Sequence, residues 1–192
     1  MLFGGFIMSF KSISQNALKE LGQVFDRITD VDVRDFLEIV KKSERIFTLG
    51  AGREGLATKS FAMRLTHLGK RSFWLWDDTT PAMGKGDLLV IANGSAETGH
   101  VAYIAKEAVK TGADIALVTT ASKGTIVGLA KVVLKVPAEA YLAQGDFVKS
   151  TQLMGNLFEQ SLFIIFDVLV MQLKEEMGIE KEDMIDRHRN VE

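Results

Sequence analysis

Apolar residues near the start of the chain recur three or four positions apart. This spacing places them on one face of a helix. It predicts a first helix over residues 13–28 and a second over residues 31–42, and in the second the apolar face carries Val33, Phe36 and Val40. Residues 1–44 are therefore expected to form an N-terminal helical segment.

The rhythm then changes to five short apolar runs rich in branched and aromatic residues. They lack polar–apolar alternation over most of their length, which is typical of strands covered on both faces. The runs are residues 45–49, 72–76, 88–92, 115–119 and 132–136. Helical patterns, clearest over residues 54–68 and 97–111, separate several of them. The alternation predicts an α/β fold with a parallel sheet of about five strands and helices on both faces.

Two more helices are expected at the end of the chain, over residues 152–177 and 181–187. The first is apolar around most of its circumference, so it must be buried on several sides, and one of these is expected to be a second subunit. We therefore predict a homo-oligomer. Asp167 and Gln172 interrupt the apolar run well short of the roughly 20 residues that span a membrane, so no membrane segment is expected.

Length and composition bound the remaining possibilities. The chain has 192 residues, with 23 Lys and Arg against 25 Asp and Glu and a net charge of −2. We expect one domain with an α/β core over residues 45–150 and C-terminal helices over residues 151–192. The balanced charge argues against a nucleic-acid or anionic-membrane surface.

Cysteine is absent, which excludes disulfides, thiolate metal sites and cysteine nucleophiles. Its absence fits a reducing compartment, so a cytoplasmic protein is expected. The apolar start of the chain lacks the basic leading segment and the cleavage pattern of a signal peptide. Both Met1 and Met8 remain candidate first residues.

The loop of residues 50–55, Gly-Ala-Gly-Arg-Glu-Gly, follows the first predicted strand. In an open parallel sheet, ligands bind beyond the carboxyl ends of the strands, where glycine lets the backbone approach closely. Gly52 and Arg53 are candidate anion contacts at the start of a helix. A dinucleotide site is an alternative, although Asp77 and Asp78 lie beyond the expected spacing of roughly 20 residues. A simple tight turn is the other alternative.

The loop of residues 93–98, Asn-Gly-Ser-Ala-Glu-Thr, follows the third predicted strand. It brings a nest of backbone N–H groups and the hydroxyls of Ser95 and Thr98 to the start of a helix, which suits a phosphate monoester. Ordinary helix capping by Ser95 or Thr98, with Glu97 favouring the helix dipole, is the alternative.

Both loops, with residues 61–69 (Phe-Ala-Met-Arg-Leu-Thr-His-Leu-Gly) and 80–89 (Thr-Pro-Ala-Met-Gly-Lys-Gly-Asp-Leu-Leu), resemble a sugar isomerase (SIS) domain. Residues 154–160 (Met-Gly-Asn-Leu-Phe-Glu-Gln) and 186–192 (Asp-Arg-His-Arg-Asn-Val-Glu) narrow the similarity to the 6-phospho-3-hexuloisomerase family. The resemblance implies a three-layer α/β/α sandwich with a five-stranded parallel sheet (flavodoxin-like), usually assembled as a tetramer, although a dimer also remains open.

The same resemblance implies conversion of 3-hexulose 6-phosphate to fructose 6-phosphate through an enediol, in the ribulose monophosphate route of formaldehyde assimilation. The reaction moves one proton between neighbouring carbons, a task suited to a carboxylate with an imidazole at the oxygens. It needs no redox cofactor. The three histidines, His67, His100 and His188, show no metal-ligand spacing, so no metal is expected.

Glu159 is the predicted catalytic base, because it lies in an otherwise apolar helical stretch where desolvation raises a carboxyl pKa. The alternative is a buried polar group that ties helices together through Gln160 or Arg64. His188 is its predicted partner, acting in its own or in a neighbouring subunit. The predicted phosphate contacts are Gly52, Arg53, Asn93, Ser95 and Thr98.

The chain departs from the family pattern at three loop positions. Glu54 and Asn93 stand where small hydroxyl residues are usual, and Ala96 stands in place of glycine. A carboxylate repels a phosphate by about 1 kcal/mol per charge pair at 4 Å in water, and by more in a drier site. Either Arg53 offsets this repulsion or Glu54 points away.

Three functions therefore remain open. The first is the isomerase, and the second is a non-catalytic sugar-phosphate sensor of the SIS type. The third is an SIS isomerase for another aldose or ketose phosphate. A sensor joined to DNA would need a basic helix-turn-helix segment, and the sequence shows none.

Overall fold

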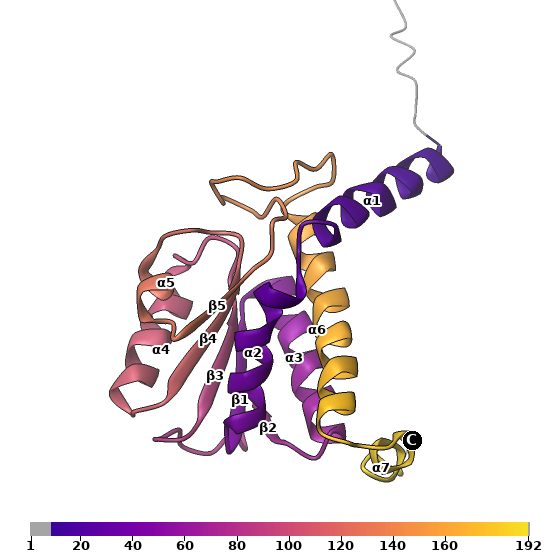
Figure 1. The fold of residues 1–192 in the computed structure, drawn as a ribbon. Helices are drawn as coiled ribbons and strands as arrows, with labels where there is room; N and C mark the ends of the chain where they lie inside the picture. Colours follow the sequence, from indigo (N-terminus) through magenta and orange to yellow (C-terminus); the bar gives the residue numbers. More distant parts are fainter. Residues whose placement is uncertain (1–8, 192) are drawn as a thin grey trace, which may run out of the picture.

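The computed structural model describes residues 9–191, and it contains a sheet of five parallel strands (Figure 1). The strands lie in the order β2-β1-β3-β4-β5, which is the flavodoxin-like order. They are β1 (Arg45–Gly50), β2 (Arg71–Trp74), β3 (Leu88–Ala92), β4 (Asp114–Thr119) and β5 (Val132–Lys135). The predicted parallel sheet is confirmed.

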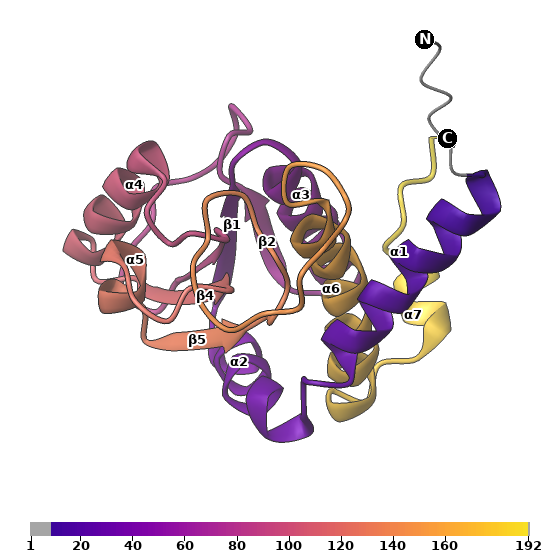
Figure 2. The same cartoon turned by 90° about the horizontal axis from the view of Figure 1, so that it is seen from above.

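Helices cover both faces of this sheet (Figures 1 and 2). On one face, α2 (Asp30–Lys42), α3 (Gly52–His67) and α6 (Asn156–Glu176) enclose one apolar core, to which the sheet contributes Ile46, Leu88 and Val90. On the other face, α4 (Gly99–Lys110) and α5 (Thr125–Leu129) enclose a second core with Phe47, Leu89 and Ile91. Because successive side chains of a strand point to opposite faces, the continuous apolar runs supply both cores. The three-layer α/β/α fold is confirmed.

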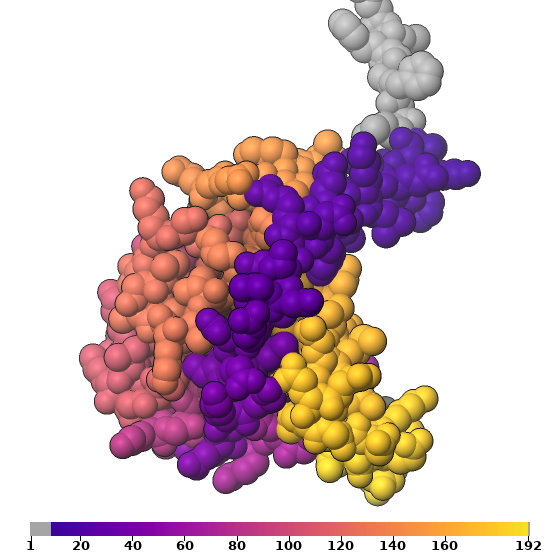
Figure 3. All heavy atoms as spheres, in the orientation of Figure 1, coloured from indigo at the N-terminus to yellow at the C-terminus, as the bar shows by residue number. Residues whose placement is uncertain are grey.

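Two helices lie outside these layers at opposite ends of the molecule. In Figure 1, α1 (Phe10–Phe25) lies beside the start of α6, whereas α7 (Lys181–Asp186) lies near the far end of α6. The space-filling view shows α1 and the region of α7 as two projections from the body of the molecule (Figure 3). The last described helix, α7, therefore lies on the side of the molecule away from the carboxyl ends of the strands (Figure 1).

Besides shifts of a few residues at other element ends, three features differ from the sequence prediction. The long C-terminal helix begins at Asn156 rather than at residue 152, because Met154 (φ 55°) and Gly155 (φ 85°) adopt left-handed backbone. The five-residue helix α5 was not predicted. The segment between β5 and α6 forms a long loop held by a parallel bridge between Ala138 and Val148.

α6 is also the described helix that is long and apolar enough to cross a membrane, by length and composition alone. Half of its most apolar window is buried inside the protein. Its buried residues include Phe158, Leu162 and Phe166, and the Phe166 ring stacks on Phe61 of α3 at 4.5 Å between centroids. The packing is that of a core helix.

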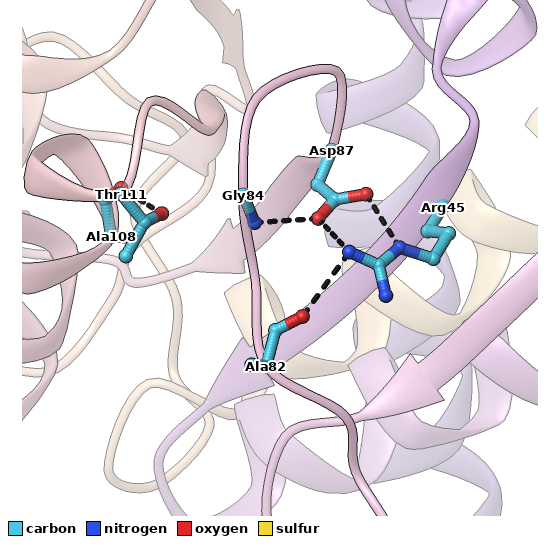
Figure 4. Close-up of polar contacts among 6 residues, drawn as sticks. All are labelled: Arg45, Ala82, Gly84, Asp87, Ala108 and Thr111. Atoms are coloured by element: carbon cyan, nitrogen blue, oxygen red, sulfur yellow. Dashed lines mark hydrogen bonds and ion pairs between the residues drawn. The ribbon is translucent and has the colours of Figure 1, made fainter.

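The amino ends of the central strands are held by an ion pair between Arg45 and Asp87 (Figure 4). Arg45 donates from Nε to Asp87 Oδ1 at 2.8 Å and from Nη2 to the Ala82 carbonyl at 3.1 Å, while the Gly84 N–H donates to Asp87 Oδ2 at 2.7 Å. Burial opposes ionisation of Asp87, but these hydrogen bonds keep its pKa below the usual value. The β2–β3 connection is thereby fixed to β1.

The opposite edge of the sheet contains a topological switch point. β1 leads into α3 on one face, and its neighbour β3 leads into α4 on the other face. The chain therefore leaves adjacent strands in opposite directions and opens a crevice at their carboxyl ends, where open α/β sheets bind ligands.

Candidate active site

The first loop at the switch point is a tight turn from β1 into α3. A Cβ atom on Gly50 would lie 2.7 Å from the Gly55 nitrogen, and one on Gly55 would lie 2.7 Å from the Gly50 carbonyl oxygen. Gly52 begins α3 with φ +54°, a conformation that favours glycine. The glycines are thus explained by turn geometry, and the predicted anion contact at Gly52 stays a prediction.

Asn93 organises the second loop from inside. Its side chain is buried, donates from Nδ2 to the Thr98 hydroxyl at 2.7 Å, and accepts the Thr98 N–H on Oδ1 at 3.3 Å. Ala96 closes the loop with φ 56°, so this alanine occupies the left-handed region that favours glycine. Asn93 therefore shapes the loop, and its predicted contact with phosphate is not tested by this geometry.

Neither predicted cap is formed on α4. Thr98 is the N-cap residue, but its side chain does not cap the helix, and Ser95 accepts the Glu97 N–H at 3.3 Å instead. Glu97 accepts the Thr125 N–H at the start of α5 at 2.5 Å. The prediction of ordinary capping is therefore wrong for α4, and its first N–H groups are left without a side-chain acceptor from Thr98. Such groups favour an anion.

Glu54 joins the two loops. One carboxylate oxygen accepts the Gly94 N–H at 2.8 Å and the other accepts Asn93 Nδ2 at 3.2 Å. Burial raises the pKa of Glu54 to about 7, against the effect of both hydrogen bonds and with a smaller contribution from the charge of Glu159. Glu54 therefore faces the second loop, and the ion pair of Arg53 is made with Glu159 rather than with Glu54.

Glu159 lies in the first turn of α6, facing the first turn of α3. Its Oε2 is 2.8 Å from Arg53 Nε, and its side chain is 17% exposed. The angles at this contact are those of an ion pair rather than a hydrogen bond, since no group among residues 9–191 donates a hydrogen bond to Oε2. Burial raises the pKa of Glu159, and the charge of Arg53 opposes the rise.

This environment suits a general base, because the carboxylate is mostly desolvated and has a free acceptor position. Glu159 does tie two helices together, as the alternative interpretation required. Its partner, however, is Arg53 on α3, not Gln160 or Arg64. Both Arg53 and Glu159 were singled out from the sequence, and the fold brings them together.

His188 lies far from this pair within one chain. Its ring is exposed and 5.2 Å from the ring of His67, at the C-terminal end of α3. The 16 residues of α3 separate this end from the switch point by about 22 Å at 1.5 Å per residue. Placing His188 beside Glu159 of its own chain is therefore wrong in this structure. His67 is buried, as expected for a residue that packs on its own helix.

A hollow of about 420 Å³ opens beside the first loop and adds residues that sequence reasoning missed. Its wall carries Lys59, Trp74, Trp76 and His100 together with the glycines. Lys59 Nζ lies 5.9 Å from the Trp74 ring centroid, a cation–π distance. The available signal was helical spacing, since Lys59 follows Gly52 by two turns on one face of α3.

No group of three or more His, Asp or Glu side chains is arranged to hold a metal ion within residues 9–191. The switch point brings together three charged side chains. Glu54 is hydrogen-bonded to the second loop, Glu159 has a free acceptor position, and Arg53 is paired with Glu159. To these the second loop adds hydroxyls and uncapped N–H groups. The arrangement can bind an anion and transfer a proton within a few ångströms.

Comparison with known proteins identifies relatives along most of the chain. A sequence profile of the SIS domain matches residues 39–164. A protein of Bacillus subtilis named 3-hexulose-6-phosphate isomerase is 33% identical over 175 residues, which cover 91% of this chain and 95% of that protein. One of the same name from Mycobacterium gastri is 40% identical over 148 residues, covering 77% of this chain and 74% of its own length.

Solved structures agree with these sequence matches. A hypothetical protein of Methanococcus jannaschii, whose crystal structure was used to infer a 3-hexulose-6-phosphate isomerase function, superposes with a TM-score of 0.78 at 26% identity. The match covers 94% of this chain and 97% of that one. A second hypothetical protein superposes with a TM-score of 0.86 at 27% identity over 96% of this chain and 98% of its own.

Proposed function

We propose that this chain, which belongs to the SIS domain family, is a sugar-phosphate isomerase that interconverts 3-hexulose 6-phosphate and fructose 6-phosphate. The observation that carries the proposal is the desolvated carboxylate of Glu159, which has a free acceptor position at the switch point. Relatives bearing the isomerase name share most of their length with this chain. The family and the site lead to the same class of reaction.

The phosphate group is proposed to bind at the start of α4. The uncapped N–H groups of the helix and the Ser95 and Thr98 hydroxyls supply donors for a phosphate monoester. Asn93 holds Thr98 in place from beneath. Gly52 and Arg53, from the first loop, complete the proposed contacts across the crevice.

Glu159 is proposed to carry the proton. It removes the hydrogen from C2 of 3-hexulose 6-phosphate, an enediol forms across C2 and C3, and the same carboxyl returns the proton to C3. One oxygen proton leaves O2 and one arrives at O3, so the step is balanced without a redox cofactor. Arg53 favours the ionised form of Glu159 and so keeps it able to accept the proton.

His188 is proposed to serve O2 and O3 from a neighbouring subunit, since within one chain it lies at the other end of α3. A homo-oligomer, either dimer or tetramer, is therefore part of the proposal. Exposed apolar side chains on α6 support it, among them Ile164, Val168 and Met171. We place the enzyme in the cytoplasm, in the ribulose monophosphate route, with no nucleic-acid or membrane partner.

Replacing Glu159 by glutamine tests the proposal. We expect turnover of fructose 6-phosphate to fall by about 10²- to 10⁴-fold, the usual contribution of a general base. Deuterium uptake at C3 of fructose 6-phosphate, followed by NMR in D₂O, should fall in parallel. Glu175→Gln, at an exposed position of the same helix, is the matched control and should exchange like the wild type.

A thermal unfolding scan accompanies both variants. Glu159→Gln should unfold at or above the wild-type temperature, because it removes a desolvated charge. Full turnover in a folded Glu159→Gln variant contradicts the assigned role. Binding of fructose 6-phosphate by the wild type without any deuterium exchange would instead favour a non-catalytic sensor.

A further inference from the structure

Glu54 interacts with both parts of the proposed site: it is hydrogen-bonded to the loop where phosphate is proposed to bind, and the charge of Glu159, the proposed base, acts on it. On one side its carboxylate accepts the Gly94 N–H at 2.8 Å and Asn93 Nδ2 at 3.2 Å. The same Asn93 nitrogen lies 2.7 Å from the Thr98 hydroxyl, where the phosphate site begins. A single amide group therefore links the Glu54 carboxylate to the proposed phosphate contacts.

No cation pairs with Glu54 in the described part of the chain. Its neighbour Arg53 forms an ion pair with Glu159 of α6, and the charge of Glu159 also acts on Glu54. Glu97, in the same loop as Gly94, is turned away and accepts the Thr125 N–H of α5. A Cβ atom on Gly94 would lie 2.4 Å from Ala140 Cβ and 3.4 Å from Phe158 Cδ1, so the remaining neighbours there are apolar.

An ionised carboxylate in this place opposes a phosphate dianion in two ways. It accepts hydrogen bonds from donors of the loop that would otherwise be free to bind an anion. It also repels the dianion through a site with little water, where charges are weakly screened. The neutral acid removes the repulsion and supplies a hydrogen-bond donor. Burial raises the pKa of Glu54 to about 7, so both forms are populated near neutral pH.

We propose that Glu54 is a specificity-determining residue that admits a phosphate monoester dianion to the α4 site only while its own carboxyl group is neutral. The inference rests on the proposed function, since it takes the ligand to be a sugar phosphate. It assigns Glu54 a role in binding, whereas Glu159 acts in proton transfer. If Glu54 acts in this way, the hydrogen bond between its carboxyl group and Gly94 sets an upper limit to the pH range in which the enzyme binds its substrate.

The pH dependence separates this effect from the other titrations at the site. A phosphate monoester loses its second proton near pH 6, so the dianion that binds best becomes more abundant as pH rises. Ionisation of Glu54 acts in the opposite direction and weakens binding as pH rises. Glu159, whose pKa is raised by burial, also changes charge, but it does so in every variant that keeps it. The difference between wild type and a Glu54 variant therefore isolates Glu54.

Calorimetric titration of the full chain with fructose 6-phosphate at about pH 6 and about pH 8.5 tests the inference. For the wild type we expect affinity to fall about tenfold or more between the two. In Glu54→Gln, which keeps the volume and an acceptor for Gly94, it should change less than about twofold. Glu97→Gln removes the same charge from the loop that contains Gly94 without touching the contact of Glu54, so it should follow the wild type.

Each result decides between the proposals. If Glu54→Gln loses affinity with pH as steeply as the wild type, or if the wild type binds equally at both pH values, the inference is overturned and the isomerase remains. If no protein binds fructose 6-phosphate at either pH, the proposed function is overturned together with the inference. If Glu54→Gln unfolds in a thermal scan, Glu54→Ser replaces it under the same expectations.

Discussion

Two glutamates lie in the first turns of neighbouring helices, Glu54 in α3 and Glu159 in α6. A helix N-terminus favours an ionised carboxylate in both cases. Their surroundings nevertheless differ. Glu54 accepts two hydrogen bonds from a loop, whereas Glu159 has an arginine beside it and, among the described residues, no hydrogen-bond donor on Oε2. Environments that differ in this way separate the roles of paired carboxyl groups.

Arg53 is expected to set the pH at which Glu159 works. Burial raises the pKa of Glu159 and the charge of Arg53 lowers it, so Arg53→Gln leaves the raising effect unopposed. The base then ionises only at higher pH. We expect the rising limb of kcat against pH to move to higher pH, with kcat near neutral pH reduced by up to about tenfold. Initial rates at saturating substrate across the pH range measure the shift.

Arg53→Lys is the matched control, since it keeps the charge but loses the planar guanidinium group. Its rising limb should stay close to that of the wild type. An effect confined to KM, with an unchanged kcat profile in Arg53→Gln, would mean that Arg53 only binds phosphate. That result would separate the ion pair with Glu159 from the proposed reaction.

The residues of the site were only partly visible in the sequence. Local composition alone marks two of them. Gly52 belongs to a glycine-rich loop after a strand, and Glu159 is an acid in an otherwise apolar helix. The contact of Glu54 with Gly94 has no local signal, because 40 residues separate them and only the adjacency of β1 and β3 brings them together. Lys59 and Trp74 were missed as well: the helical spacing from Gly52 marks Lys59, but the hollow that it shares with Trp74 depends on how β2 lies beside α3.

At the scale of elements, Glu20 fastens α1 to the loop that leads into α6. Its carboxylate accepts the Ser150 hydroxyl at 2.6 Å, the Thr151 N–H at 2.9 Å and Gln152 Nε2 at 3.0 Å. Burial opposes ionisation, but these hydrogen bonds outweigh it and lower the pKa of Glu20 to about 2. The ionised form of Glu20 is therefore much more stable in the folded chain than in the unfolded one.

Glu20→Gln should lower the free energy of unfolding by about 2–3 kcal/mol at neutral pH. A lowered folded-state pKa gives stability that is present above the ordinary glutamate pKa and is lost as pH falls toward 2. The difference between wild type and variant should therefore shrink over that acidic range. Urea unfolding at several pH values measures it.

Glu182→Gln, at an exposed position of α7, controls for the loss of one negative charge and should change the unfolding free energy by less than about 0.5 kcal/mol. A Glu20→Gln variant as stable as the wild type at neutral pH would show that the loop does not depend on this carboxylate. In that case its hydrogen bonds are replaced by water at no net cost.

The elements themselves were largely predictable. The central strands β1, β3 and β4 are short apolar runs because both of their faces are buried, and such runs need no tertiary information to be found. The helix α5 escaped detection because five residues are too few to show a period. The start of α6 was misplaced because Met154, which carries no helix-breaking signal, adopts left-handed backbone beside Gly155, the residue that precedes the helix.

At the scale of the whole molecule, two features of the single chain remain unexplained by its own fold. α6 carries exposed apolar side chains, including Phe163, Val168 and Met171. The sequence predicted this helix to be apolar nearly all round, and one chain covers only part of it. His188, predicted to serve the site, lies at the other end of α3. A second subunit packed on α6 would account for the first feature and is required by the proposed role of His188.

Mixing two inactive variants tests whether the site is shared between subunits. Glu159→Gln keeps His188, and His188→Ala keeps Glu159, so a mixed dimer with shared sites contains one site with both residues intact. Random association makes about half of the dimers mixed, and half of their sites are intact. Co-expression of differently tagged chains should therefore restore about a quarter of wild-type turnover in the whole population, and about half in mixed dimers isolated through both tags.

The control pairs Glu159→Gln with a chain that carries both Glu159→Gln and His188→Ala. No combination of these chains contains an intact Glu159, so no activity should return on mixing. If each site instead uses residues of one chain, mixed dimers have no intact site either, and the first pair stays inactive as well. Activity regained only by the first pair assigns Glu159 and His188 to different subunits of one site. Because α3 separates the two residues by about 22 Å within a chain, this is the outcome that the fold predicts.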